Sequence, residues 1–181
     1  PSRGATQEAG RLAKEAGALI SFDVNYRPSL WPQPEEAVSV IEAMLPKADL
    51  VKVNEDELEL LSGTDDLSDG SAQLLAKGPT ICVVTLGAEG SYFRSPLGEG
   101  RIPPFRVETV DAVGCGDAFT AGLLSRLTGY DDLQEALAPE ALAANLRYAN
   151  AVGALTALTR GTIPALPTAE AVEVFLEERT E

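Results

Sequence analysis

The stretch "VDAVGCGDAFTAGLL" (residues 110–124) places two glycines directly before a run of apolar residues. Gly114 and Gly116 can adopt backbone angles that are closed to other residues, so they predict a tight turn that opens a helix. Such a turn exposes successive N–H groups that suit an anion. Asp117 falls in the first helical turn, where the helix dipole favours a carboxylate. This combination suits phosphoryl transfer to an alcohol, with the carboxylate accepting the hydroxyl proton.

A plainer interpretation stays open for these residues, because Asp117 could simply cap the helix while the glycines form a tight turn. Two other nucleotide-binding motifs are excluded. A dinucleotide-binding fingerprint requires a third glycine where this chain has Phe119. A P-loop requires a Gly-Lys dipeptide, which occurs nowhere in the sequence.

The composition is that of an ordinary globular domain: 181 residues, of which 45% are hydrophobic and 23% charged. The net charge of −14 argues against nucleic acid or an anionic membrane as the main partner. The chain has no histidine, which excludes His bases, Ser-His triads and His metal sites. Cys82 and Cys115 are its two cysteines, so a reducing cytoplasm is the expected location. No apolar run approaches the roughly 18 to 20 residues of a membrane span.

Strands alternate with helices along most of the chain, which is typical of an α/β protein. The apolar run "ALISFDV" (18–24) predicts a buried parallel strand. Further strands are expected at 49–53 and 80–86, and helices at 5–17, 35–45, 54–63, 71–78, 139–160 and 168–179 and after the glycine turn. We therefore predict a three-layer α/β/α sandwich with a mainly parallel sheet and a small antiparallel ribbon around 91–110. The segment 62–70 is expected to be a surface loop.

Polar and glycine-rich segments follow the expected strands. In such sheets ligands bind beyond the carboxyl ends of the strands. The segments at those ends are Asp23 to Arg27, Asn54 to Glu57, Thr85 to Gly90, and Asp111 to Asp117.

The stretch "DAVGCGDAFTAGLL" (111–124) resembles the C-terminal signature D-T-x-G-A-G-D-x-F of the ribokinase-like, or PfkB, carbohydrate kinases. It departs from that signature at Ala112, where Thr is usual, and at Cys115, where Ala is usual. The resemblance implies that Asp117 is the catalytic base. It also implies that the backbone amides of Gly114, Cys115, Gly116 and Asp117 form the anion hole.

Two shorter motifs agree with this resemblance. "NEDE" (54–57) resembles the family's N-x-x-E motif, which implies that Asn54 and Glu57 place magnesium and phosphate; the alternative is a helix capping box. "TLGAEGS" (85–91) resembles the nucleotide-binding turn. It implies that Thr85, Gly87 and Gly90 lie near the phosphates and ribose of ATP; the alternative is a simple strand-to-hairpin turn.

Two longer segments also resemble the family. "YANAVGALTALTRG" (148–161) is similar to the helix beside the adenine pocket, with Asn150 and Gly153 as candidates; plain helix packing is the alternative. "FDVNYRPSLW" (22–31) resembles D-x-N-x-R-x-x-L-W of the fructokinase and 2-keto-3-deoxygluconate kinase branch. It implies that Asn25 and Arg27 meet substrate or phosphate, because a planar guanidinium suits both. The alternative is an ordinary loop arginine.

The resemblance implies an ATP-dependent kinase that phosphorylates a hydroxyl of a sugar or sugar acid, with fructose or 2-keto-3-deoxygluconate favoured. Its cofactors would be ATP and Mg²⁺, the ion being placed indirectly by Asn54 and Glu57. A monovalent cation such as K⁺ would bind near Asp111 and the turn at Gly161. Residues 1–181 would form a single α/β nucleotide-binding and catalytic portion, without the N-terminal sugar-binding and lid portion, of a protein that is a homodimer at full length.

Three alternatives remain at this point. The first is a ribose or nucleoside kinase of the same fold. The second is a nucleotide-binding fragment that is inactive by itself, because most sugar contacts would lie in the absent portion. The third is an α/β scaffold that binds no nucleotide.

Overall fold

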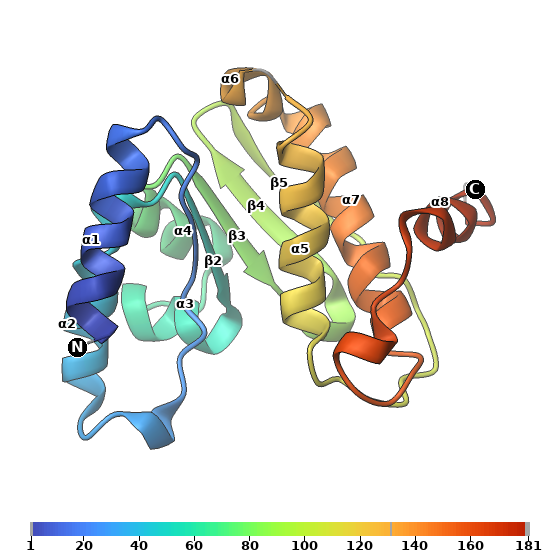
Figure 1. The fold of residues 1–181 in the computed structure, drawn as a ribbon, viewed down its shortest axis with the longest axis horizontal. Coiled ribbons are helices and arrows are strands. Elements are labelled where there is room, and N and C mark those ends of the chain that lie inside the picture. Colours follow the sequence, from blue (N-terminus) through green and yellow to red (C-terminus); the bar gives the residue numbers. More distant parts are fainter. Residues whose placement is uncertain (1, 131, 180–181) are drawn as a thin grey trace. The chain divides into compact units, whose positions relative to one another are not determined.

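The computed structural model describes residues 2–130 and 132–179, and its contacts divide the chain into two compact units. Unit 1 consists of Pro1–Thr85 and Tyr92–Glu99, and unit 2 consists of Leu86–Ser91 and Gly100–Glu181. Figure 1 labels the helices and strands of both units. The chain crosses from one unit to the other three times between residues 85 and 100.

The sheet has five strands in the order β1-β2-β3-β4-β5. The first three, β1 (Ser21–Asp23), β2 (Leu50–Asn54) and β3 (Ile81–Thr85), are parallel. Two residues join β4 (Ser91–Ser95) to β5 (Gly98–Ile102), and five join β3 to β4. Connections this short require antiparallel neighbours, since parallel strands need a long crossover. The expected α/β class, with helices flanking a mainly parallel sheet, is confirmed, although the ribbon expected at 91–110 ends at 102.

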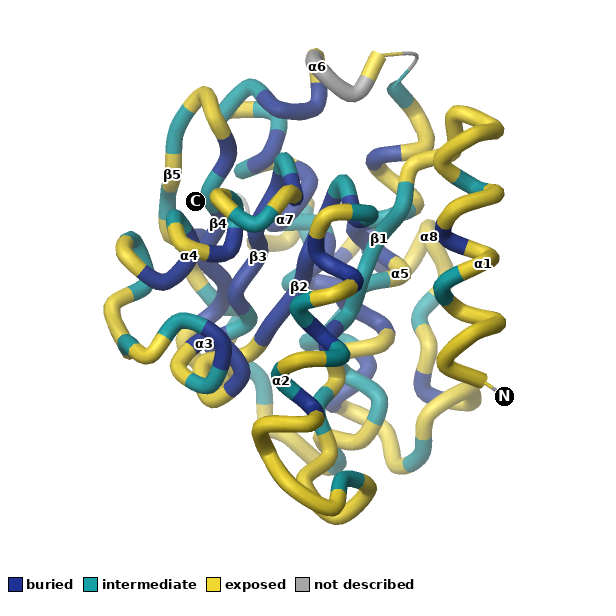
Figure 2. The backbone as a smooth tube through the Cα atoms, turned by 90° about the vertical axis from the view of Figure 1, so that its left-hand side faces the viewer, coloured by how far each residue is buried: buried dark blue, intermediate teal, exposed yellow. Residues whose placement is uncertain are grey.

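The core of unit 1 is built on the two central strands. Residues 50–53 of β2 and 81–84 of β3 are all buried, as the dark blue segments in Figure 2 show. The four α-helices of this unit are α1 (Ser2–Glu15), α2 (Pro34–Glu42), α3 (Glu55–Ser62) and α4 (Leu67–Leu75). Short 3-10 turns lie at Pro28–Leu30 and Leu45–Lys47. Leu58 and Leu61 of α3 and Leu74 of α4 are buried with the strands.

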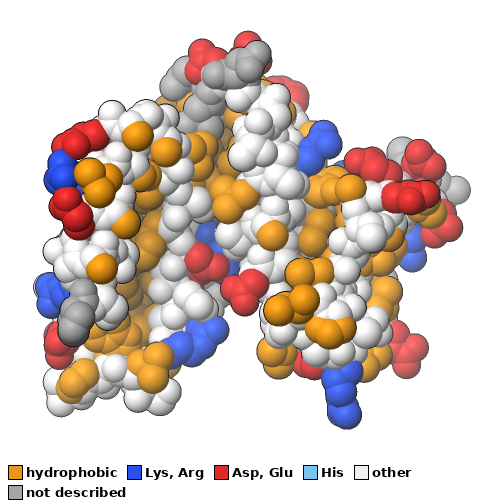
Figure 3. Space-filling view, in the orientation of Figure 1, with side chains coloured by type: hydrophobic (Ala, Val, Ile, Leu, Met, Phe, Trp, Pro, Cys, Tyr) orange, Lys and Arg blue, Asp and Glu red, His pale blue; other side chains and the backbone are white. Residues whose placement is uncertain are grey.

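Helix α1 presents a mainly charged outer face, with acidic and basic side chains alternating along it in Figure 3. Arg11 forms ion pairs with Glu8 and Glu15, each at 2.5 Å between nitrogen and oxygen. Pairs spaced three and four residues apart lie on one side of a helix, so this face is a solvated one.

Two expectations for unit 1 were wrong in detail. The strand expected at 18–24 is only three residues long and half-buried. It comes first in the strand order, and among the described residues only β2 pairs with it. The loop expected at 62–70 is shorter, because α4 begins at Leu67. The Oδ1 atom of Asp66 accepts a hydrogen bond from the Asp69 amide at 2.7 Å and caps that helix.

Unit 2 contains α5 (Cys115–Leu127), α6 (Leu133–Ala136), α7 (Pro139–Thr156) and α8 (Ala169–Glu177). Helices α5 and α7 lie side by side (Figure 1), and glycines allow the approach. A Cβ atom on Gly122 would lie 2.8 Å from Cγ2 of Val152, and one on Gly153 would lie 3.4 Å from the Cys115 carbonyl oxygen. The helix expected at 139–160 ends earlier, at Thr156. No helix in the described parts of the chain has the length and apolar character needed to span a bilayer.

The turn after β3 is a 3-10 turn, Gly87–Glu89, closed by a hydrogen bond from the Leu86 amide to the Gly90 carbonyl at 2.9 Å. Gly90 has φ +92°. A Cβ atom there would lie 2.2 Å from the Ile102 carbonyl oxygen and 2.8 Å from the Pro104 nitrogen. Gly87 also has positive φ, +53°, but nothing lies within 4 Å of its Cβ position. Of these two glycines, only Gly90 is therefore required for close packing.

Replacing Gly90 by Ala should reduce the free energy of unfolding by about 2–5 kcal/mol, because backbone strain and a clash with main-chain atoms add together. The matched variant Gly87→Ala introduces strain alone and should reduce it by about 1–2 kcal/mol. Chemical denaturation of both variants measures the difference. Equal losses would show that the contact at Ile102 and Pro104 does not constrain the turn.

Candidate active site

The carboxyl ends of β2 and β3 lie side by side in unit 1. Asn54 and Thr85 are register partners at these ends. The Thr85 hydroxyl donates a hydrogen bond to the Val53 carbonyl at 3.3 Å, which ties the end of β3 to β2. The structure thus brings together two side chains that the sequence assigned to nucleotide and metal binding.

Asn54 and Glu57 form a complete capping box at the start of α3. The Oδ1 atom of Asn54 accepts from the Glu57 amide at 2.8 Å, and Oε2 of Glu57 accepts from the Asn54 amide at 2.9 Å. This was the structural alternative for the motif, and it is confirmed. A role for the two residues in placing magnesium stays a prediction.

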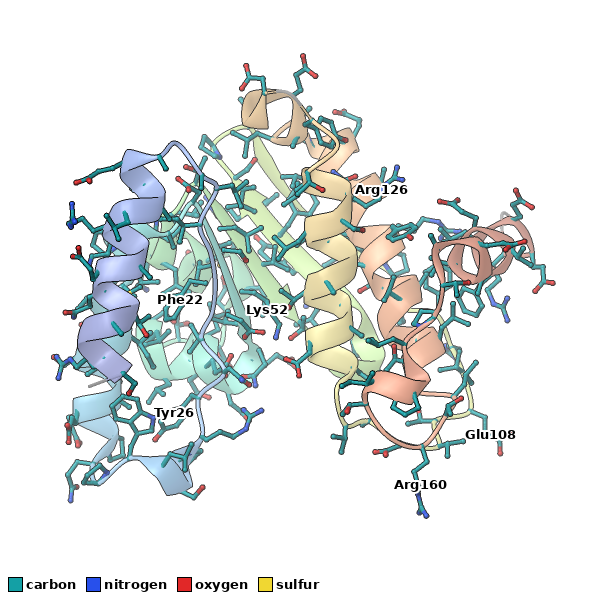
Figure 4. The ribbon with its side chains drawn as sticks, in the orientation of Figure 1. Phe22, Tyr26, Lys52, Glu108, Arg126 and Arg160 are labelled. Carbon is teal, nitrogen blue, oxygen red and sulfur yellow. The ribbon has the colours of Figure 1, made fainter. Side chains whose placement is uncertain are left out.

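The second carboxylate oxygen of Glu57 reaches the loop that follows β1. Its Oε1 accepts from the Tyr26 amide at 2.7 Å. Figure 4 labels Tyr26 on this loop. The contact brings the Asn25–Arg27 segment to the start of α3. Arg27 itself is exposed, and its Nη1 donates to the Tyr26 carbonyl at 3.1 Å.

An ion pair at the same strand ends was not found by sequence reasoning. The Nζ atom of Lys52, labelled in Figure 4, donates to Oδ2 of Asp23 at 2.9 Å. The two side chains are only 10% and 21% exposed, respectively, and they come from register partners on β2 and β1. A lysine inside the apolar strand "DLVKV" was the available signal, since a buried lysine needs a partner.

The start of α5 in unit 2 is built differently from the other helix starts. Gly114 is the N-cap with φ +83°, and a Cβ atom there would lie 2.9 Å from Cγ2 of Thr162. Side chains cap α3, α4 and α8, and a proline occupies the first position of α2 and α7. Of the six helices α2, α3, α4, α5, α7 and α8, only α5 has neither a side-chain cap nor a proline at its first position.

Two amides in the first turn of α5 have no acceptor among the described residues, and one of them is the third-position amide that a side chain satisfies in α3 and α4. The Cys115 amide donates to the Ala112 carbonyl at 3.3 Å, and the Ala118 amide to the Gly114 carbonyl at 2.9 Å. The amides of Gly116 and Asp117 have no acceptor among the described residues. The Asp117 side chain is exposed and makes no hydrogen bond or ion pair with another described residue. The structure gives no support to a capping role for Asp117, and an anion site at this turn stays a prediction.

Asp111 joins the loop before α5 to the end of α7. Its Oδ1 accepts from the Val113 amide at 3.0 Å and its Oδ2 from the Gly161 amide at 3.1 Å. These two hydrogen bonds, with a smaller effect from Arg160, lower the pKa of Asp111. The contact confirms that Asp111 and the turn at Gly161 lie together. Burial and the nearby Asp111 charge raise the pKa of the Cys115 thiol, which favours its protonated form.

Three of the other predicted residues of unit 2, Asn150, Gly90 and Gly153, have packing roles. The amide nitrogen of Asn150 donates to the carbonyls of Ile102, at 3.4 Å, and Pro103, at 3.2 Å. Gly90 packs on the same segment, and Gly153 faces α5. Binding of ATP by Thr85, Gly87, Gly90, Asn150 and Gly153 stays a prediction.

The acidic residues do not form a preformed metal cage. No group of three or more Cys, Asp or Glu side chains in the described parts of the chain could hold a metal ion. Each oxygen of Glu57 already accepts one amide.

A family model described as "pfkB family carbohydrate kinase" matches residues 2–169. The chain belongs to the pfkB family. A curated relative, probable fructokinase-2 from Arabidopsis thaliana, is 42% identical over 169 residues, which are 93% of this chain and 51% of that protein. The pfkB chain thus spans about half the length of the curated relatives it matches.

Solved structures of kinases share the fold of this pfkB chain. A fructokinase from Xylella fastidiosa with bound ATP aligns with a TM-score of 0.90 at 35% identity, covering 99% of this chain and 58% of that one. An aminoimidazole riboside kinase from Salmonella enterica, complexed with aminoimidazole riboside and an ATP analog, aligns at 0.86 and 35%, covering 97% and 58%. A fructokinase double mutant from Vibrio cholerae, bound to fructose, ADP and potassium, aligns at 0.89 and 34%, covering 97% and 56%.

The Asp111 contact predicts a pH-dependent stability of the pfkB chain. A lowered pKa means that the carboxylate stabilises the fold above its usual value of 3.8 and loses this effect as pH falls through the lower value. Asp111→Asn should therefore lower the melting temperature by a few degrees at pH 7, and the difference should shrink below about pH 4. Melting curves from pH 7 to 3 measure this.

The control for this experiment is Asp65→Asn, which changes an exposed loop carboxylate. It should leave the melting temperature unchanged across the range. A difference for Asp111→Asn that stayed constant from pH 7 to pH 3 would contradict the assigned role of the charge.

Proposed function

We propose that the protein is an ATP-dependent sugar kinase that transfers the γ-phosphoryl group to a hydroxyl of fructose or 2-keto-3-deoxygluconate. The observation that carries this proposal is the start of α5. There the exposed carboxylate of Asp117 lies in the same turn as two amides that have no acceptor among the described residues. Such a turn suits a carboxylate that takes a proton beside an anion that carries charge. Membership of the pfkB family supports the same chemistry.

In the proposed reaction, the sugar hydroxyl oxygen attacks the γ-phosphorus and its proton passes to the Asp117 carboxylate. The bond from that phosphorus to its bridging oxygen breaks, and ADP leaves. The amides of Gly114 to Asp117 stabilise the charge on the moving phosphoryl group, as backbone donors do in oxyanion holes. The amides of Gly114, Gly116 and Asp117 are the ones available for this role, because the Cys115 amide already donates to Ala112.

The nucleotide and its ions are assigned to the strand ends and turns. Mg²⁺ would neutralise phosphate charge, with Asn54 and Glu57 placing it through water. Thr85, Gly87 and Gly90 would lie near the phosphates and ribose, and Asn150 and Gly153 near the adenine. A potassium ion is proposed because the similar fructokinase from Vibrio cholerae is described as potassium-bound, and its place near the Asp111 loop rests on the family resemblance. Association of two full-length chains is proposed on the family resemblance alone.

The identity of the sugar that accepts the phosphoryl group is inferred from the loop after β1. Asn25 and Arg27 are both exposed there, and Glu57 fixes the loop between them. The Arg27 guanidinium has donors beyond the one that bonds to the Tyr26 carbonyl, and such a planar group suits sugar-acid or phosphate oxygens. The relatives named as fructokinases favour fructose among the two acceptors.

A riboside kinase is the second candidate, because the aminoimidazole riboside kinase aligns as closely in identity as the Xylella fructokinase does. The deciding experiment measures ADP release by the full-length protein with Mg-ATP and fructose, 2-keto-3-deoxygluconate, ribose or adenosine. Release with fructose or 2-keto-3-deoxygluconate supports the proposal, and release with ribose or adenosine supports the second candidate. ATP binding without release from any acceptor indicates a nucleotide-binding protein. No ATP binding would contradict both kinase functions.

Asp117→Asn should lower kcat by about 10²- to 10⁴-fold, the usual contribution of a positioned base, while leaving ATP affinity nearly unchanged. The matched control is Asp69→Asn, since Asp69 is an exposed carboxylate at the same third position of α4. It should retain normal turnover. Steady-state kinetics with the best acceptor measure both variants, and normal turnover in Asp117→Asn would remove it as the base.

A further inference from the structure

We propose that Glu57 is a positioning residue for the acceptor sugar as well as a helix cap. Its buried carboxylate fixes the Asn25–Arg27 loop, so one side chain sets both the start of α3 and the loop assigned to the sugar. The inference rests on the proposed function for the identity of the ligand. The contact itself lies wholly within unit 1.

The carboxylate of Glu57 is placed to hold two separate pieces of backbone. The residue is only 3% exposed, and it forms no ion pair with a described Lys or Arg. Its charge is balanced instead by the amides of Asn54 and Tyr26, at 2.9 and 2.7 Å, and by the N-terminal dipole of α3. Hydrogen bonds to a charged acceptor are stronger than neutral ones. Each amide is therefore held firmly, and neither can be released without leaving a buried charge less well satisfied.

The loop needs this restraint because its backbone is strained. Asn25 has φ +46° and is the only described non-glycine residue with positive φ. Such a residue persists only where its surroundings determine it. Hydrogen bonds lie on both sides of it: Val24 donates to the Lys52 carbonyl at 3.1 Å, and Tyr26 donates to Glu57. Without the Glu57 oxygen, the loop is restrained on one side alone.

Glutamine at position 57 is the sharpest substitution. It has the same shape but only one accepting oxygen, and its amide group donates. One of the two backbone amides would then face a donor. Asn54→Ala is the first control, since it breaks the same capping box but leaves the Glu57–Tyr26 bond. Glu55→Gln is the second control, an exposed residue in the same helical turn with the same change of charge.

The experiment measures fructose binding to the full-length protein by calorimetry, without nucleotide and without metal. Under these conditions any effect of Glu57 on magnesium is absent. Glu57→Gln should weaken fructose binding by about tenfold or more, the scale of one charge-assisted hydrogen bond. Asn54→Ala and Glu55→Gln should stay within about twofold of wild type. Melting curves set the measuring temperature below the transition of each variant.

Three results of the calorimetry and one of hydrogen exchange decide the matter. Wild-type fructose affinity in Glu57→Gln would overturn the proposal. An equal loss in Asn54→Ala would also overturn it, because the effect would then belong to the helix cap. If the wild-type protein bound no sugar, the proposed function would fail, and hydrogen exchange would test the contact separately. The Tyr26 amide of the wild-type protein should be protected; exchange at the rate of an unstructured amide would overturn the positioning role without any variant having to fold.

Discussion

The first amide groups of every helix have no carbonyl in the same helix that can accept their hydrogen bonds. The whole candidate site depends on how these donors are satisfied. At α3 the side chains of Asn54 and Glu57 accept them, and at α4 Asp66 does so. At α5 the third-position amide, that of Asp117, keeps no acceptor among the described residues, because Gly114 has no side chain to offer. This helix start therefore differs from those of α3 and α4 in lacking a side-chain cap.

The two carboxylates at the third helical position have opposite environments. Glu57 is buried and both of its oxygens accept backbone amides, so it holds the chain in place. Asp117 is exposed and its side chain bonds to no other described residue, so it can accept a proton from a ligand. A carboxylate at the third helical position thus stabilises the backbone in α3, whereas in α5 it is exposed and is the base that we propose.

Much of this could be predicted from the sequence, because the deciding signals are local. Glycines around Cys115 predicted the turn that opens α5, and the spacing of Asn54 and Glu57 predicted the capping box. The start of α4 was missed because the Asp-rich segment before it reads equally well as a loop, while Asp66 is in fact the cap.

The contacts that could not be predicted join residues far apart in the chain. The Tyr26 amide and Glu57 are separated by 31 residues, and Lys52 and Asp23 by 29. Finding such pairs requires the strand register, which alternating patterns of apolar residues do not specify. The side-chain amide of Asn150 bonds to carbonyls 47 and 48 residues earlier, a contact that the sequence did not indicate, and its place near the adenine stays a prediction.

The division of the chain into units has a consequence for how the protein can be cut or rebuilt. Residues 86–91 belong to unit 2 and residues 92–99 to unit 1, so the chain passes between the units three times. Neither unit is one continuous segment. A truncation after Thr85 would remove β4 and most of the sheet's antiparallel hairpin from unit 1, while unit 2 would lose its first turn if it began at Gly100. A single cut anywhere between residues 85 and 100 therefore leaves at least one unit without part of its chain.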